Sequence, residues 1–166
     1  MTEIVLSSRP AESDEDARKI ARLLCEMYKE VGRLPVDANE AFKELYRIIK
    51  EEAAWLVEDQ NGLEVATLGV QTVPGAWYSP DTPFLCETWF YILPGLRGGV
   101  ARQLLEAELA AFCDATGLPA FIEYFDPSRL AEHGQRKVSV GEKNAYIPMG
   151  RICRVNPFGV PVVNEG

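Results

Sequence analysis

The chain has 166 residues and a formal net charge of −8 at pH 7, with 47% hydrophobic and 25% charged residues. This size and balance are typical of a single soluble globular domain, and no stretch approaches the ~20 apolar residues of a transmembrane helix. The diffuse acidity argues against nonspecific nucleic-acid binding, which needs a positive face. It suits a cationic partner such as an amine, and an acidic surface that serves solubility alone is the alternative.

The first half of the sequence predicts two helices and a β-hairpin. Apolar residues recur at helical spacing between Ser13 and Gly32 and again after Asp37. The Asn61-Gly62 pair between two apolar runs is typical of a hairpin turn. The expected elements are a strand over 3–8, helices over 13–32 and from 37 to about 49, and strands over 53–58 and 63–73.

The second half predicts a strand, a helix and further strands. An aromatic run from Phe84 to Leu93 precedes a turn rich in Pro, Gly and Arg, and an amphipathic helix follows from about Gly99 to Gly117. Residues 128–143 are ambiguous, because helical and β-branched patterns mix there. We expect further strands over 119–125 and within 146–155.

The order β-α-α-β-β-β-α-β-α-β predicts an α/β chain. Early antiparallel hairpins and a later strand–helix–strand crossover imply a central mixed, mostly antiparallel sheet with helices on both faces. We expect one domain over 1–156 and an extended tail over 157–166, which contains two prolines and two glycines. Because the N-terminus lacks a signal-peptide pattern, we expect a cytoplasmic protein.

The turn after the aromatic strand is the strongest functional signal. Glycines let the backbone approach a ligand closely, the first amides of the next helix lack acceptors, and Arg97 and Arg102 add positive charge. The turn lacks the lysine of a Walker A loop, and Gly95, Gly98 and Gly99 do not fit GxGxxG. An ordinary tight connection with solvent-exposed arginines is the alternative.

The turn resembles motif A of the GNAT N-acetyltransferase superfamily. Gly99-Val100-Ala101, aligned on Leu104-Leu105, is similar to the family's Gly-x-Gly/Ala, and Ile92-Leu93-Pro94 is similar to its Val-x-Pro. The β-α-α-β-β-β-α-β order agrees over nearly the whole chain. Leu96 stands at the family's Gln/Arg position, with Arg97 one residue later.

This resemblance implies direct transfer of an acetyl (acyl) group from acetyl-CoA to an amine. The main chain at the end of the strand would bind pantetheine and the thioester, and the turn would bind the diphosphate. The cofactor-binding candidates are Phe90, Tyr91, Ile92, Leu93, Arg97, Gly98, Gly99, Val100, Ala101 and Arg102.

Several carboxylates and tyrosines are candidates for acid–base chemistry. Glu87 is the only carboxylate in the aromatic strand, and some family members carry a catalytic glutamate near this point. The alternative is that Glu87 has no catalytic role and simply lies at the exposed start of the strand. Glu123 is a second choice for the base. Tyr146 is the first candidate for the general acid and Tyr91 and Tyr124 are alternatives, although the family's C-terminal Asn-x-x-Ala-x-x-x-Tyr pattern is missing.

The acceptor is expected to be a small-molecule amine or a protein amine, with no nucleic acid or membrane partner, and a homodimer is left open. Four cysteines without a CxxC pair and a single histidine give no metal-binding pattern. Leu96 and the missing tyrosine pattern favour the alternative of a non-catalytic GNAT-like module that binds a protein or small ligand.

Overall fold

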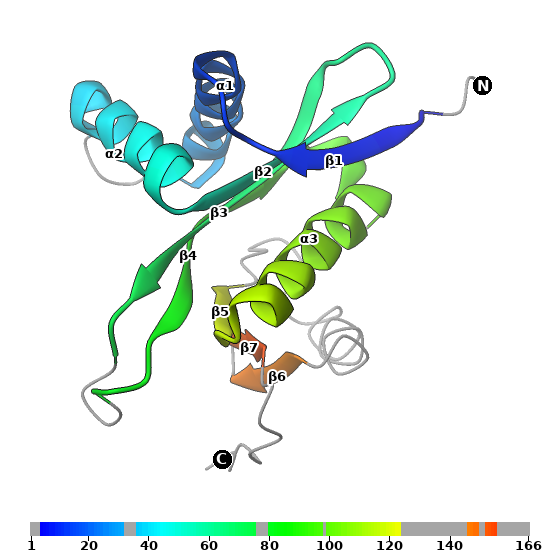
Figure 1. The fold of residues 1–166 in the computed structure, drawn as a ribbon. Coiled ribbons are helices and arrows are strands. Elements are labelled where there is room, and N and C mark those ends of the chain that lie inside the picture. The colour runs from blue at the N-terminus through cyan, green and yellow to red at the C-terminus, as the bar shows by residue number, and fades with distance from the viewer. Residues whose placement is uncertain are drawn as a thin grey trace. The chain divides into compact units, whose positions relative to one another are not determined.

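The computed structural model describes residues 4–31, 36–75, 80–97, 99–123, 146–149 and 152–155. Within them, no helix is both long and apolar enough to cross a lipid bilayer. The elements (Figure 1) are β1 Leu6–Pro10, α1 Asp14–Val31, α2 Ala38–Glu51, β2 Ala53–Asp59, β3 Glu64–Val73, β4 Phe84–Ile92, the 3₁₀ helix η1 Pro94–Leu96, α3 Val100–Thr116, β5 Ala120–Glu123, β6 Tyr146–Met149 and β7 Ile152–Val155.

The elements form two compact units. One comprises Met1–Gln71 and Thr88–Phe112, and the other comprises Thr72–Glu87 and Cys113–Gly166. The hydrogen-bonded strand order is β1-β2-β3-β4 in the first unit and β4-β5-β7-β6 in the second. The division into a domain and a C-terminal tail stays a prediction.

The sheet of the first unit is built from antiparallel neighbours. β1 pairs with β2 from Leu6↔Asp59 to Pro10↔Trp55, and β2 pairs antiparallel with β3. The first strand was expected over 3–8, but it continues through Pro10. A proline is tolerated there because β1 pairs with β2 alone in the described order and a proline at an edge interrupts no second ladder.

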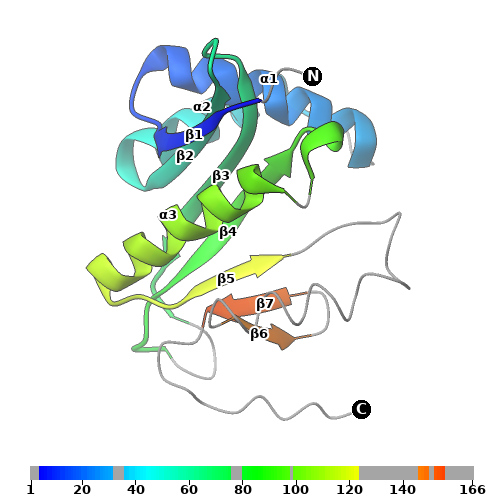
Figure 2. The same ribbon diagram turned by 90° about the vertical axis from the view of Figure 1, so that its right-hand side faces the viewer.

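Helices cover both faces of this sheet, as the sequence predicted. Ala54 and Leu56 of β2 belong to the buried cluster formed with α1 and α2. The alternate residue Trp55 points the other way and makes an edge-on ring contact with Phe112 of α3, with centroids 5.5 Å apart. Figures 1 and 2 show α1 and α2 on one face of β2 and β3, and α3 on the other.

The second unit contains a parallel pair of strands. β4 pairs parallel with β5 at Leu85↔Ala120 and Cys86↔Phe121. In the sequence, β4 precedes α3 and β5 follows it. β5 and β6 each pair antiparallel with β7. The described pairings are therefore mixed and mostly antiparallel, as expected, and the ambiguous segment 128–143 lies outside the described residues.

A buried carboxylate holds the connection between β1 and α1. Asp16 Oδ2 accepts from the backbone amides of Glu12 and Ser13 at 3.0 and 2.9 Å, and Arg9 donates to Oδ1 at 2.6 Å. The Ser13 hydroxyl accepts in turn from the Asp16 amide at 3.1 Å, which completes a reciprocal cap of α1. Burial alone would raise the pKa of Asp16, but these hydrogen bonds lower it overall.

Asp16→Asn is expected to lower the free energy of unfolding at pH 7 by about 1–3 kcal/mol, because it removes a charged acceptor from three donors. Because the folded-state pKa is depressed, the contribution of Asp16 is complete above its unfolded-state pKa of about 3.9 and declines as the pH falls further. Urea unfolding at pH 7 and pH 3 should therefore show the largest deficit at pH 7.

The matched control is Glu15→Gln, which removes the same charge from an exposed position in the same helical turn. It should change stability by less than about 0.5 kcal/mol. An equal loss in both variants would contradict a specific capping role for Asp16.

Candidate functional site

The end of β4 is held in place on two sides. Trp89 and Tyr91 are buried in the cluster under α1 and α2. At the strand end the amide of Leu93 donates to the Val65 carbonyl of β3 at 3.0 Å, and the Leu93 carbonyl accepts from Leu96 at 2.9 Å. The amide and the carbonyl of Leu93 are therefore both hydrogen-bonded within the protein. Backbone hydrogen-bond donors for a ligand must come from other residues of the turn.

The start of α3 presents an open surface. Among the described residues, a Cβ on Gly99 would make an ordinary contact with the carbonyl oxygen of Leu96, at 3.7 Å, and Val100 is 56% exposed. The amide of Gln103 bonds to the Gly99 carbonyl at 3.5 Å, so the amides of Gly99 and Val100 precede the hydrogen-bond ladder of the helix. These two amides lie at the positive end of the dipole of α3, and such a helix end binds anions.

Ala101 of the predicted turn has different surroundings from Gly99 and Val100. Ala101 is completely buried, so it packs the start of α3 into the core and exposes no atom to a ligand. Gly98 lies outside the described residues. Their direct binding of the cofactor stays a prediction.

Arg97 belongs to a cluster that joins the turn to the end of α1. Its Nη2 atom donates to both carboxylate oxygens of Glu30, at 2.8 and 2.7 Å, and its Nε donates to the Ile92 carbonyl at 3.0 Å. The Tyr91 hydroxyl donates to Glu30 Oε1 at 2.5 Å, and the guanidinium lies 5.5 Å from the Tyr91 ring centroid. The side chains of Arg97 and Glu30 are 40% and 33% exposed, so solvent reaches the pair.

The cluster keeps its carboxylate ionised and its phenol protonated. The hydrogen bond from Tyr91, assisted by the Arg97 ion pair, lowers the pKa of Glu30 against the opposing effect of burial. Burial and the neighbouring Glu30 carboxylate raise the pKa of Tyr91 to about 12. Glu30 had no sequence signal, because it meets partners more than 60 residues further along the chain.

Arg102 turns away from the turn and into the protein. Its Nε donates to Glu106 Oε1 at 2.6 Å, and the two side chains are only 11% and 4% exposed. This pair spans one turn of α3 on its inner side. The geometry favours a structural role for Arg102, and its predicted contact with a phosphate stays a prediction.

The acid–base candidates are only partly described. Glu87 is half-buried in β4 and lies in the second unit. The backbone of Tyr146 forms part of β6, but its side chain lies outside the described residues, as does all of Tyr124. The described structure does not bring these three together, and their catalytic roles stay predictions.

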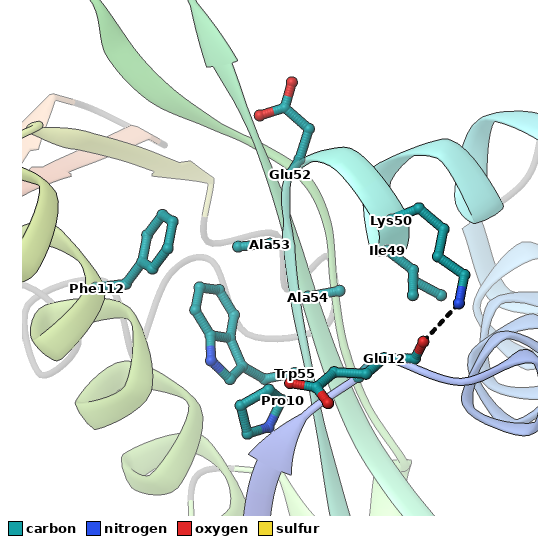
Figure 3. Close-up of a pocket in the computed structure, with 10 residues that line it drawn as sticks. Pro10, Glu12, Ile49, Lys50, Glu52, Ala53, Ala54, Trp55 and Phe112 are labelled. Carbon is teal, nitrogen blue, oxygen red and sulfur yellow. Dashed lines mark hydrogen bonds between the residues drawn. The ribbon is translucent and has the colours of Figure 1, made fainter.

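A separate hollow of about 400 Å³ lies in the first unit, lined by Trp55, Phe112 and the Lys50–Glu12 contact, among others (Figure 3). Lys50 Nζ donates to the Glu12 carbonyl at 2.7 Å. The hollow includes Ala53, which pairs with Val70 of β3. The β4–α3 turn instead meets β3 at Val65, about 17 Å along the strand. The hollow is therefore distinct from the turn.

Several solved structures that are similar to this chain are acetyltransferases. A GNAT family acetyltransferase from Brucella melitensis in complex with acetyl-CoA matches with a TM-score of 0.63 and 13% identity, over 95% of this chain and 91% of that one. An aminoglycoside antibiotic 6'-N-acetyltransferase from Acinetobacter baumannii matches with a TM-score of 0.62 and 13% identity, over 95% and 99%.

Some matched chains are much longer than this one. The chain spans 17% of a structure of the GCN5-related glucosamine N-acetyltransferase region in a fungal multi-domain GH3 beta-N-acetylglucosaminidase, with 13% identity, a TM-score of 0.61 and 89% of this chain covered. No family model and no curated protein matches the sequence. These likenesses show the fold: the chain has the fold that these GNAT acetyltransferases share.

The two arginines are expected to differ in their effect on stability. Arg102→Ala should lower the free energy of unfolding by about 3–5 kcal/mol, because it removes the guanidinium that is paired with the buried Glu106 carboxylate. Arg97→Ala removes a half-exposed ion pair and should cost less than about 1 kcal/mol. Urea unfolding of both variants measures the difference, and equal losses would show that Arg97 is also structural.

Proposed function

We propose that this protein is an N-acyltransferase that transfers an acetyl (acyl) group from acetyl-CoA directly to an amine acceptor. The observation that carries the proposal is the exposed start of α3 immediately after β4, within a fold shared with acetyltransferases that were solved with acetyl-CoA. Acetyl-CoA would supply an acyl group activated as a thioester. The protein's own groups must then bind the diphosphate, orient the amine and move its proton.

The turn fits a diphosphate in both shape and charge. The surface in front of Gly99 is open to a close approach of phosphate oxygens, and the amides of Gly99 and Val100 lie at the positive end of α3. Arg97 is half-exposed beside them and can make a charge-assisted contact. Phe90, Tyr91 and Ile92 precede the turn and are the segment proposed to bind pantetheine through the main chain.

The amine must lose a proton before or during its attack on the thioester. We assign this role to Glu87, a half-buried carboxylate on β4. Tyr146 or Tyr124 is the proposed donor of the proton to the departing thiolate. The acidity of the chain supports a cationic small-molecule acceptor, such as the aminoglycosides of the Acinetobacter baumannii enzyme, and a protein amine is the second candidate.

Gly99→Glu should weaken the binding of coenzyme A at least about tenfold, because it adds bulk and negative charge in front of the positive end of α3. The added Cβ makes only an ordinary contact, so the fold should persist. Isothermal titration calorimetry measures the affinity. Ala111→Glu adds the same charge at an exposed position of α3 and should bind coenzyme A like the wild type.

If Gly99→Glu and the wild type bind coenzyme A equally well, the turn is not the cofactor site. If neither the wild type nor Ala111→Glu binds coenzyme A, the acyltransferase proposal fails, and another ligand of the same fold becomes the better explanation.

Glu87→Gln should lower kcat about 100-fold or more while leaving the affinity for coenzyme A unchanged, because it removes a proton acceptor and keeps the size of the side chain. A steady-state assay of thiol release with an amine panel measures kcat. Asp114→Asn, an exposed carboxylate in the same unit, should keep wild-type turnover. Unchanged turnover in Glu87→Gln would assign the base to another residue.

A further inference from the structure

The C-terminal end of α1 forms a cation site that the protein fills with its own arginine. Glu30 lies in the last turn of α1, where the helix dipole makes the local potential negative. Its carboxylate, the face of the Tyr91 ring and the Ile92 carbonyl all contact the guanidinium of Arg97. Carboxylates, aromatic faces and carbonyl oxygens are also the groups that bind ammonium ions.

Glu30 adds nothing to the stability of α1 by itself, since a carboxylate is unfavourable at a helix C-terminus. It is balanced there by Arg97, which comes from the turn proposed to bind a diphosphate. Arg97 is thus attracted by two anions, Glu30 and the diphosphate. An ion pair that is this exposed contributes little stability, so a ligand can displace it easily.

We propose that the diphosphate of the acyl-CoA draws Arg97 away from Glu30, and that an ammonium group of the acceptor then takes the place of the guanidinium beside Glu30 and Tyr91. This inference rests on the proposed acyltransferase function. It makes Glu30 a residue that determines acceptor specificity, and it places acceptor binding after acyl-CoA binding.

The held ammonium group is not the amine that is acetylated. A carboxylate stabilises the protonated form of an amine beside it, whereas attack on the thioester needs the neutral form. The acceptor therefore carries at least two amino groups, one held by Glu30 and another that reacts. Diamines, polyamines and amino sugars belong to this class, and the net charge of −8 suits them.

The first test is calorimetric titration of coenzyme A into the wild type, Glu30→Gln and Glu26→Gln. Glu30→Gln should bind coenzyme A about threefold more tightly, because Arg97 no longer has a competing carboxylate. Glu26→Gln removes the same charge one turn earlier on α1, where it pairs only with Lys29 among the described contacts, and should match the wild type. A merely structural role of Glu30 would not tighten the binding.

The second test titrates spermidine and butylamine into the protein with and without saturating coenzyme A. Spermidine should bind at least about fivefold more tightly to the saturated wild type, and this gain should be lost in Glu30→Gln. Butylamine has a single ammonium group, which also fits beside Glu30, so it should show a gain that is likewise lost in Glu30→Gln. The inference is wrong if the wild type and Glu30→Gln bind coenzyme A with equal affinity. It is also wrong if spermidine binds the wild type equally well with and without coenzyme A. If the wild type does not bind coenzyme A, the proposed function itself fails.

Discussion

Burial of the Trp89 and Tyr91 side chains beneath α1 and α2 determines where β4 ends, and the turn depends on that position. Each ring contributes about 2–3 kcal/mol when it is removed from water, and a shift of β4 by one residue would take both rings out of this cluster. The Trp89 indole also donates to the Thr67 hydroxyl of β3 at 3.0 Å, which ties the strand to its neighbour. With β4 held this way, the Leu93 amide meets Val65, and the chain must leave the sheet there.

The two arginines near the start of α3 show how similar residues acquire different roles. Arg102 faces inward and balances a buried carboxylate, so its charge is used within the fold. Arg97 remains half-exposed between the turn and Glu30, so its charge is available to a ligand. Burial decides this division, because a buried ion pair cannot lose one partner without a large cost in free energy, whereas an exposed pair can exchange partners.

The Glu30 cluster connects the proposed cofactor turn to the end of α1. Tyr91 orients the carboxylate through its hydroxyl and offers its ring face to a cation. A single carboxylate therefore faces a position that either a guanidinium or an ammonium group can occupy. Competition of this kind couples the binding of two ligands without a large movement of the backbone, because only side-chain partners change.

The sequence alone determined the helices from Ser13 and Asp37, the hairpin at Asn61-Gly62 and the strand–turn–helix around Gly99, because hydrophobic period and capping are local signals. It also pointed to the fold through its resemblance to motif A. Only the tertiary structure decided that Arg102 faces inward and that Glu30 meets Arg97. The Glu30–Arg97 contact joins residues on different elements, and the Arg102–Glu106 contact depends on which side of α3 is buried. Neither the spacing nor the composition of the sequence encodes such pairings.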